Sequence, residues 1–294
     1  NPLTEYADEK YNADLYRAEP FSETLCVSAE NVALDGFTDE PSLHAAGLFN
    51  LNERSVEYGY RLYDKLYPAS TTKLMTAYLA LKYGKLEDMV TVTDSVTGFA
   101  IDEVVCGLYP GGQVKLYDLL CGLLLKSGND CGVAIAEYIS GSVEAFAELM
   151  NEEAKELGAT GTHFVNPHGL HEDDHYTTAY DLYLIFNECI KHDDFVKIIM
   201  EKSHTAKITG NDGTVRSITW EPTNFYATGD AKKPDNVTVI GGKTGTTQLA
   251  GNCLILLTKD KNNHPYISIV MKADTKPLLY KDMTAIVEAI PENN

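Results

Sequence analysis

The order of the predicted secondary-structure elements constrains this chain more than any other feature of its sequence. The clearest strands are predicted at residues 252–258 and 266–271, and a β-hairpin is predicted at 45–60. Four apolar segments with helical spacing lie between residues 116 and 190. Strands at both ends therefore enclose a helical block, so that block must be inserted between two halves of one sheet.

Further weak strand patterns occur at residues 205–209, 214–218 and 237–246, and a closing helix is predicted at 278–290. We expect an α+β fold, an α/β sandwich in which one antiparallel sheet is built from both chain ends and flanked by helices. An all-helical subdomain of about residues 84–200 is expected as the insertion.

The composition is that of a folded protein: 44% of the 294 residues are hydrophobic and 23% are charged. The formal net charge of −19 excludes nucleic acid and anionic membrane surfaces as partners. No apolar run is long enough to cross a membrane, and no signal peptide opens the chain, as expected of a mature or trimmed form. Residues 1–24 are interpreted as an acidic arm or linker, and residues 25–294 as a single catalytic domain.

Six cysteines are scattered along the chain, and no two form the C-x-x-C spacing of a zinc ribbon or a thioredoxin-type site. Most lie among apolar residues, which predicts buried free thiols, although the sequence leaves disulfide pairing open. The six are Cys26, Cys106, Cys121, Cys131, Cys189 and Cys253.

The segment of residues 67–76 carries the first candidate chemistry. Ser70 and Lys73 stand three residues apart at the predicted start of a helix, so both lie on one face. A lysine accepts the proton of a serine hydroxyl when burial or a nearby cation lowers its pKa. An isolated S-x-x-K pattern is nevertheless common, and it usually means only a helix cap and a surface lysine.

Two later segments supply possible partners. The segment Ser127-Gly128-Asn129 lies in the break between two predicted apolar helices. The Ser127 hydroxyl can pass a proton, and the Asn129 side chain can hydrogen-bond to a substrate amide. Lys243 to Gly245 belong to a late strand, where the glycine leaves room for an extended substrate to pair with that strand. Lys243 is also a second cation that would lower the pKa of Lys73.

The three motifs in this order resemble the active-site-serine enzymes that recognise penicillin. Residues 67–73, 125–130 and 162–170 are similar to the D-alanyl-D-alanine carboxypeptidases, the low-molecular-mass penicillin-binding proteins, and the similarity covers most of residues 45–273. The resemblance implies a β-lactamase-like fold and a serine-type peptidase. It also implies peptidoglycan stem peptides ending in D-Ala-D-Ala as substrates and β-lactam antibiotics as covalent inhibitors.

The resemblance also implies roles for individual residues. Ser70 would be the nucleophile and Lys73 its base, Ser127 and Lys243 would relay a proton to the leaving amine, and Asn129 would orient the peptide. No cofactor and no metal are expected. The implied location is extracytoplasmic, in the bacterial cell envelope, reached by secretion or through an N-terminal anchor outside this sequence.

The late strand would bind the end of the substrate. The resemblance implies that Lys243, Thr244 and Thr246 receive its carboxylate, that Gly245 lies against the peptide, and that the N–H groups of Ser70 and Thr246 form an oxyanion hole. Many members of the family carry His or Tyr where this chain has Thr246, which leaves the side-chain selectivity open.

Three alternatives remain. A class A β-lactamase normally has S-D-N in place of Ser127-Gly128-Asn129 and a glutamate shortly afterwards, whereas residues 161–170 contain no acid. A metal hydrolase is suggested by the histidines and acids of residues 168–175, but a polar loop explains them more simply. A non-catalytic sensor of β-lactams or wall peptides is disfavoured because Ser70 and Lys73 are both present.

Overall fold

The computed structural model describes residues 21–35, 37 and 43–290. Most of the predicted arm, residues 1–20, lies outside the described residues, and Phe21–Thr24 form a short 3₁₀ helix, η1. No helix within the described ranges combines the length and apolar character that a membrane span requires. All six cysteines are buried free thiols, as the sequence predicted for most of them, and no disulfide joins them.

The larger sheet is built from both ends of the chain, as predicted. Its order is β2-β1-β9-β8-β7, and neighbouring strands are antiparallel. The N-terminal hairpin supplies one edge, and the two most strongly predicted strands lie side by side within the sheet. The strand bounds are Ala45–Asn50 for β1, Ser55–Tyr60 for β2, Thr238–Thr247 for β7, Gly251–Lys259 for β8 and Pro265–Ala273 for β9.

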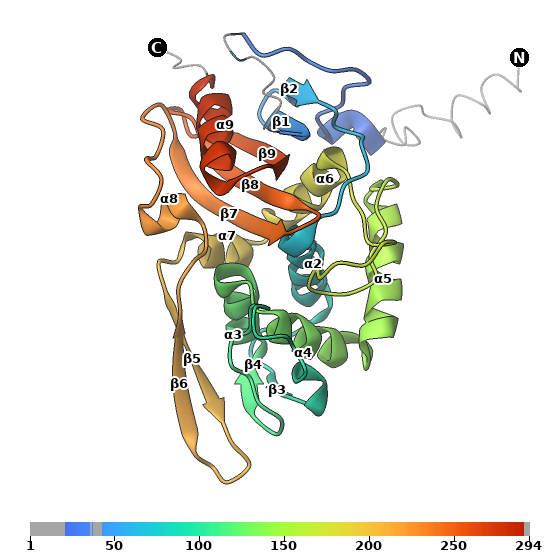
Figure 1. Cartoon of the computed structure of the whole chain (residues 1–294), viewed down its shortest axis with the longest axis vertical. Helices are drawn as coiled ribbons and strands as arrows, with labels where there is room; N and C mark the ends of the chain where they lie inside the picture. The colour runs from blue at the N-terminus through green and yellow to red at the C-terminus, as the bar shows by residue number, and fades with distance from the viewer. Residues whose placement is uncertain (1–20, 36, 38–42, 291–294) are drawn as a thin grey trace, which may run out of the picture.

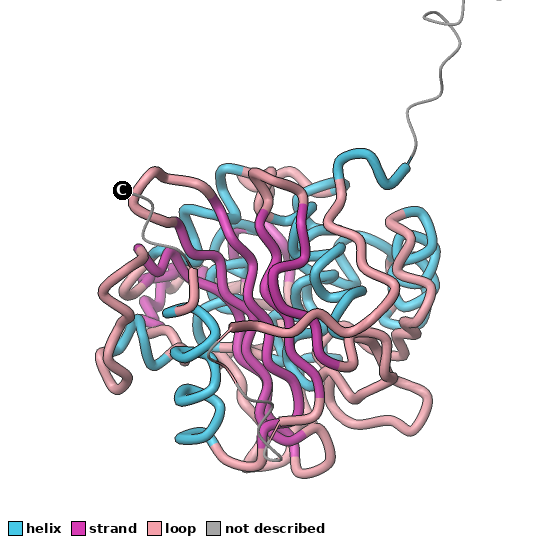
Figure 2. The backbone as a smooth tube through the Cα atoms, turned by 90° about the horizontal axis from the view of Figure 1, so that it is seen from above, coloured by secondary structure: helices cyan, strands magenta, loops and turns pink. Residues whose placement is uncertain are grey.

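Both faces of this sheet are buried, which explains why β8 is apolar along its length. Leu254 and Leu256 point into one hydrophobic cluster, to which helix α9 (Lys276–Glu288) contributes, while Ile255 and Leu257 point into the other. The second cluster also contains residues of helix α6 (Ala179–Cys189). The strands therefore run through the middle of the molecule with helices on both sides (Figure 2).

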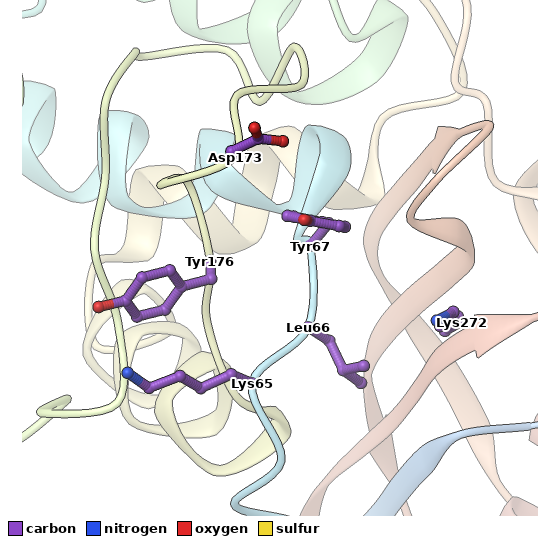
Figure 3. Close-up of a pocket in the computed structure, with 6 residues that line it drawn as sticks. All are labelled: Lys65, Leu66, Tyr67, Asp173, Tyr176 and Lys272. Carbon is purple, nitrogen blue, oxygen red and sulfur yellow. The ribbon is translucent and has the colours of Figure 1, made fainter.

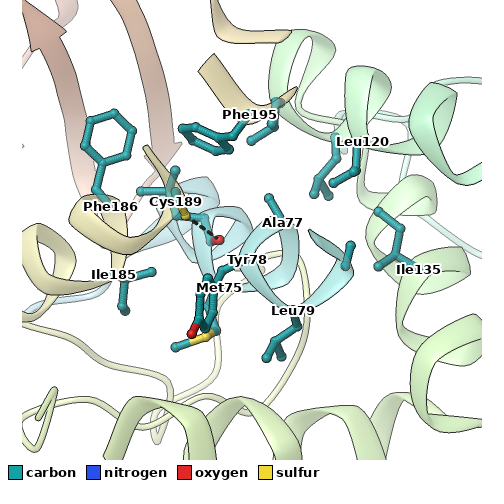
Figure 4. Packing of buried hydrophobic residues seen from close by; sticks show 14 of the residues in the cluster. Met75, Ala77, Tyr78, Leu79, Leu120, Ile135, Ile185, Phe186, Cys189 and Phe195 are labelled. Atoms are coloured by element: carbon teal, nitrogen blue, oxygen red, sulfur yellow. Dashed lines mark hydrogen bonds between the residues drawn. The ribbon is translucent and has the colours of Figure 1, made fainter. Parts of the chain in front are cut away.

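Helix α2 (Lys73–Tyr83) is the centre of the helical block (Figure 4). Every residue from Lys73 to Ala80 is buried, and the Cys189 thiol of α6 donates to the Leu74 carbonyl at 3.3 Å. The other helical segments are η2 Ala69–Thr72, η3 Asp94–Val96, α3 Leu116–Cys121, the π-helical η4 Gly122–Lys126, α4 Asn129–Ser140, α5 Val143–Glu156, α7 Asp193–Met200 and α8 Phe225–Thr228.

A second, four-stranded sheet corrects two details of the prediction. Its order is β3-β4-β5-β6, so β5 (His204–Thr209) and β6 (Val215–Trp220) do not join the larger sheet. The strands β3 (Met89–Thr91) and β4 (Gln113–Lys115) lie within residues 84–200, which are therefore not all helical. Strands of three residues are too short to show a pattern. Figure 1 shows the β5–β6 hairpin projecting from the helical block.

Candidate active site

Ser70 lies in the 3₁₀ turn η2, directly before α2, and not in the first turn of an α-helix as predicted. The preceding Ala69 has a φ of +48°, an unusual conformation for a residue with a side chain. The Thr71 hydroxyl donates to the Pro68 carbonyl at 2.7 Å and stabilises the turn. The turn leaves Ser70 beside Lys73, the first residue of α2.

Lys73 is fully buried, and its Nζ contacts three groups. It lies 2.9 Å from Ser70 Oγ, 2.8 Å from Asn129 Oδ1 and 2.7 Å from the His168 carbonyl oxygen. A neutral amine has two N–H groups and one lone pair. If the two N–H groups donate to Asn129 and His168, the lone pair faces the Ser70 hydroxyl.

The surroundings of Lys73 favour this neutral form. Burial lowers the pKa of Lys73 well below its ordinary value, and the charge of Lys243 lowers that pKa further. The motifs pointed to Lys243 as the cause, whereas burial is the larger of the two causes. An uncharged lysine within hydrogen-bond distance of a serine hydroxyl has the arrangement of a general base and its nucleophile.

The buried Asp130 carboxylate holds the Ser127–Asn129 segment in place. Ser127 ends η4 with a φ of +68°, and the Asn129 N–H donates to the Val104 carbonyl at 2.8 Å. Asp130 accepts the backbone N–H groups of residues 106–108. Sequence analysis did not single out Asp130 as a site residue, although an acid directly after the motif was the available signal.

Lys243 forms a second serine–lysine pair. Its Nζ donates to Ser127 Oγ at 2.9 Å and to the Thr244 carbonyl at 2.8 Å. The side chain is almost fully buried, and burial lowers its pKa to about 7. The structure thus forms two pairs, Ser70 with Lys73 and Ser127 with Lys243. Asn129, two residues after Ser127, connects them through its contact with Lys73.

Gly245 allows β7 to approach the Ser70 turn closely. A Cβ atom at this position would lie 3.0 Å from the Pro68 carbonyl oxygen and 3.0 Å from the backbone nitrogens of Ser70 and Thr71. The sequence analysis assigned the missing side chain to substrate binding. The structure gives a different reason, which is the close contact between the strand and the Ser70 turn.

We expect Gly245→Ala to lower the rate of Ser70 acylation by up to about 100-fold, because the added methyl group pushes backbone atoms of the Ser70 turn out of position. Reaction of the variant with a labelled penicillin measures this rate, and thermal unfolding shows whether the fold is retained. A folded variant that acylates at the wild-type rate would show that the close approach has no catalytic consequence.

The two threonine side chains of the late strand have different partners. Thr244 Oγ1 lies 2.6 Å from Thr223 Oγ1, whereas Thr246 Oγ1 donates to Asn252 Oδ1 at 3.2 Å. Thr246 therefore directs its hydroxyl proton to a neighbouring strand. Thr223 precedes α8 and was not predicted, since it belongs to no motif and only the fold brings it to β7.

The loop of residues 161–170 packs against the Ser70 turn, η2. Gly169 has a φ of +90°, and a Cβ atom there would lie only 1.8 Å from the Ala69 carbonyl oxygen. The Thr76 hydroxyl donates to the Pro167 carbonyl at 2.6 Å, which holds the loop to α2. The His168 carbonyl that contacts Lys73 is a backbone group, so no side-chain pattern could have indicated it.

The three histidines of residues 168–175 make separate contacts. The ring of His168 lies against Phe99, that of His171 against Tyr67, and His175 Nε2 is 2.7 Å from Thr72 Oγ1. None of them belongs to the metal-binding groups found among the described residues. The arrangement gives the metal-hydrolase alternative no support.

Buried histidine makes the fold sensitive to acid. Burial lowers the pKa of His175 to about 3, so between pH 6.5 and 3 the unfolded chain binds a proton that the folded chain does not. Stability is therefore lost as pH falls, by about 2–3 kcal/mol at pH 4.5 for this residue. We expect His175→Gln to reduce the difference between urea unfolding free energies at pH 7 and pH 4.5. An unchanged difference would contradict this.

A cavity of about 390 Å³ opens above Ser70 and Asn129. Its wall is formed by Ser70, Asp102, Glu103, Val104, Asn129, Gly169, Leu170, His171, Thr246, Thr247 and Gln248. A smaller hollow of about 240 Å³ lies nearby, beside Tyr67 and Tyr176 (Figure 3), and its lining includes none of the predicted site residues. The first cavity is therefore the candidate substrate site.

The fold and the two serine–lysine pairs define the class of active-site-serine enzymes that recognise penicillin. The family model described as D-alanyl-D-alanine carboxypeptidase matches residues 45–275. The chain therefore belongs to the D-alanyl-D-alanine carboxypeptidase family, as its motifs suggested.

Individual relatives agree with this assignment. The chain is 33% identical to D-alanyl-D-alanine carboxypeptidase DacA of Haemophilus influenzae, over 85% of this chain and 62% of that protein. It is 34% identical to D-alanyl-D-alanine carboxypeptidase DacF of Bacillus subtilis, over 82% of this chain and 61% of that protein. The chain thus spans about three fifths of the length of these two relatives.

Solved structures confirm the fold. The crystal structure of the Streptomyces K15 DD-transpeptidase superposes with a TM-score of 0.79 at 26% identity, over 86% of this chain and 98% of that one. Penicillin-binding protein 5 of Haemophilus influenzae gives a TM-score of 0.71 at 32% identity, over 85% of this chain and 69% of that one. The predicted β-lactamase-like, DD-peptidase-like architecture is confirmed.

Proposed function

We propose that this protein is a serine-type D-Ala-D-Ala carboxypeptidase that removes the terminal D-alanine from peptidoglycan stem peptides. The observation that carries the proposal is the contact of buried Lys73 with Ser70 Oγ at 2.9 Å, because it supplies both a nucleophile and its base. The family match and the names of the relatives support the substrate class.

The reaction begins with transfer of the Ser70 hydroxyl proton to Lys73 Nζ. Ser70 Oγ then attacks the carbonyl carbon of the last peptide bond and forms a tetrahedral intermediate. The leaving D-alanine nitrogen takes the proton of the Ser127 hydroxyl, which receives a hydrogen bond from Lys243. The proton that Lys73 took from Ser70 replaces it on Ser127, so Lys73 is neutral again before water attacks. The carbon–nitrogen bond breaks, and Ser70 is left as an acyl ester that water hydrolyses with Lys73 again accepting a proton.

The remaining residues orient the peptide. An extended substrate pairs with β7 and places its carboxylate near Lys243 and Thr244, and the Asn129 side-chain amide faces a peptide group. The backbone N–H groups of Ser70 and Thr246 stabilise the oxyanion. Each of the two threonine hydroxyls has one protein partner, and Thr246 lines the cavity, so we assign the carboxylate to Lys243, Thr244 and Thr246 together.

We further propose that residues 25–294 form one catalytic domain and that the protein acts outside the cytoplasm, in the bacterial cell envelope where its substrate lies. β-Lactams are proposed as covalent inhibitors, since they offer Ser70 a reactive carbonyl. The family's substrate and the names of its members support this location.

The experiment that tests the function is an assay of D-alanine release from a synthetic peptide ending in D-Ala-D-Ala, run beside hydrolysis of a chromogenic cephalosporin. We expect multiple turnovers with the peptide and a single slow burst with the cephalosporin. Fast multiple turnover of the cephalosporin would indicate a β-lactamase. Acylation by the cephalosporin without any D-alanine release would indicate a sensor.

The absence of acids from residues 161–170 supports the peptidase over the β-lactamase. In this loop the group that reaches Lys73 is the His168 carbonyl, which cannot accept a proton from a deacylating water. The acyl-enzyme formed with a β-lactam is therefore expected to persist.

A further inference from the structure

A second cluster of reactive side chains lies where α3, the end of α7 and the start of β5 meet (Figure 1). It contains Cys121 at the end of α3, Glu201 directly after α7 and His204 at the start of β5. We propose that these three side chains bind a zinc ion. The site is separate from the serine–lysine pairs, and the proposal does not depend on the peptidase function.

The donor atoms are close enough to share one ion. One ligand atom each from Cys121, Glu201 and His204 lies within 4.8 Å of the other two. His204 Nδ1 is 3.0 Å from Glu201 Oε2, and two ligands in a tetrahedral zinc site stand about 3.3 Å apart. A small movement of the Glu201 side chain, which is partly exposed, is enough to admit the ion.

Two further side chains hold the proposed ligands in place. His204 Nε2 lies 2.7 Å from Asp118 Oδ1, and the Tyr117 hydroxyl lies 3.2 Å from Glu201 Oε1. Metal-binding histidines generally donate their second ring N–H to a carboxylate, which fixes the tautomer and orients the other nitrogen toward the metal. Asp118 and Tyr117 occupy these supporting positions.

The chemistry of the donors selects zinc. Thiolate, imidazole and carboxylate are its usual ligands, and three protein ligands leave a fourth position for water. Binding transfers the Cys121 thiol proton to solvent, and His204 binds through the Nδ1 lone pair while Nε2–H donates to Asp118. The thiolate and the Glu201 carboxylate then balance the two positive charges of the ion.

A second group of possible ligands, Cys106, Asp130 and Cys131, is a weaker candidate. Its carboxylate already accepts the backbone N–H groups of residues 106–108 and of Cys131. Both thiols also press against Gly122, where a Cβ atom would lie 2.7 Å from one sulfur and 2.9 Å from the other. That group serves as an internal control for the proposal.

The test uses the whole purified chain after removal of metals with a chelator. We expect one Zn²⁺ to bind per chain and to raise the thermal unfolding temperature, and we expect Co²⁺ to give a thiolate-to-cobalt absorption band. Cys121→Ala and Glu201→Gln are expected to weaken zinc binding by more than about 100-fold, and Asp118→Asn by about 10–100-fold. Cys131→Ala is expected to retain both the affinity and the band.

Penicillin acylation of each variant shows whether its fold is retained, and Glu201→Gln keeps the test possible if replacement of the buried thiol disturbs folding. The proposal is overturned if the wild-type chain binds no zinc. It is also overturned if Glu201→Gln binds as tightly as the wild type, or if the cobalt band is lost in Cys131→Ala and retained in Cys121→Ala.

Discussion

Lys73→Arg and Lys73→Met should each lower the rate of acylation by a labelled penicillin by about 100- to 10,000-fold, the usual contribution of a general base. Arginine keeps the charge but cannot release its proton, and methionine keeps much of the volume but has no basic nitrogen. Both variants should therefore lose the group that takes the Ser70 proton, for opposite reasons.

The pH dependence of the same rate gives a second measure of Lys73. A protonated ammonium group cannot accept a proton, so the acylation rate should fall as pH is lowered through the pKa of Lys73. Because burial and the charge of Lys243 lower that pKa, the fall should occur well below the ordinary value of 10.5. Lys82→Arg, which changes a lysine paired with Glu153, is the control and should react normally.

Equal acylation rates in the wild type and in folded Lys73→Met would contradict the role of Lys73. The base would then have to be another group near Ser70. Urea unfolding of each variant distinguishes a lost base from a lost fold, since Lys73 is fully buried and its replacement alters packing around α2.

Lys243→Gln is predicted to have the second large effect. Loss of a charge-assisted hydrogen bond to the substrate carboxylate costs about 1.5–3 kcal/mol, or about 10- to 150-fold in kcat/KM. A peptide whose C-terminus is an amide never makes this bond, so its kcat/KM should fall much less. The comparison of the two peptides therefore separates carboxylate binding from general damage to the site.

The same variant should also change the pH profile. Removal of the Lys243 charge takes away one cause of the lowered pKa of Lys73, so the acid limb should move to higher pH. In the wild type, Lys243 itself loses its charge as pH rises through about 7, and carboxylate binding should weaken there. Equal losses of kcat/KM for the two peptides, together with a fall in rate at the same acidic pH as in the wild type, would contradict two roles of Lys243. These are the binding of the carboxylate and the lowering of the pKa of Lys73.

Much of the fold could be predicted because its clearest hydrophobic patterns extend over long segments of the sequence. The apolar strands at 252–258 and 266–271 and the hairpin at 45–60 place the larger sheet, and the helical periodicity between them places the inserted block. The strands β5 and β6 of the smaller sheet were predicted, but their pairing with the three-residue strands β3 and β4 in a separate sheet was not. Strands of that length depend on tertiary pairing and carry almost no pattern of their own.

Only the parts of the candidate site that consist of side chains in sequence motifs could be predicted. The pairing of Ser70 with Lys73 follows from their spacing of three residues, whereas the pairing of Ser127 with Lys243, which are 116 positions apart, was implied only by the family resemblance. The His168 carbonyl contacts Lys73 through a backbone atom, which any residue type would supply. Gly245 was expected to leave room for the substrate, whereas only the fold shows that the Ser70 turn lies against it.

The proposed zinc ligands were also invisible in the sequence. Cys121 stands 80 residues before Glu201, and no spacing of metal ligands links them. The fold brings them together because α3 packs against β5, the strand that begins with His204.

The central claim is that Ser70 is the nucleophile of a covalent mechanism, and mass spectrometry of the intact and digested protein after treatment with penicillin tests it most directly. We predict one penicillin adduct per chain, located on the peptide that contains Ser70, and no adduct on Ser70→Ala. An adduct on any other residue, or an undiminished adduct on the Ser70→Ala variant, would contradict the account.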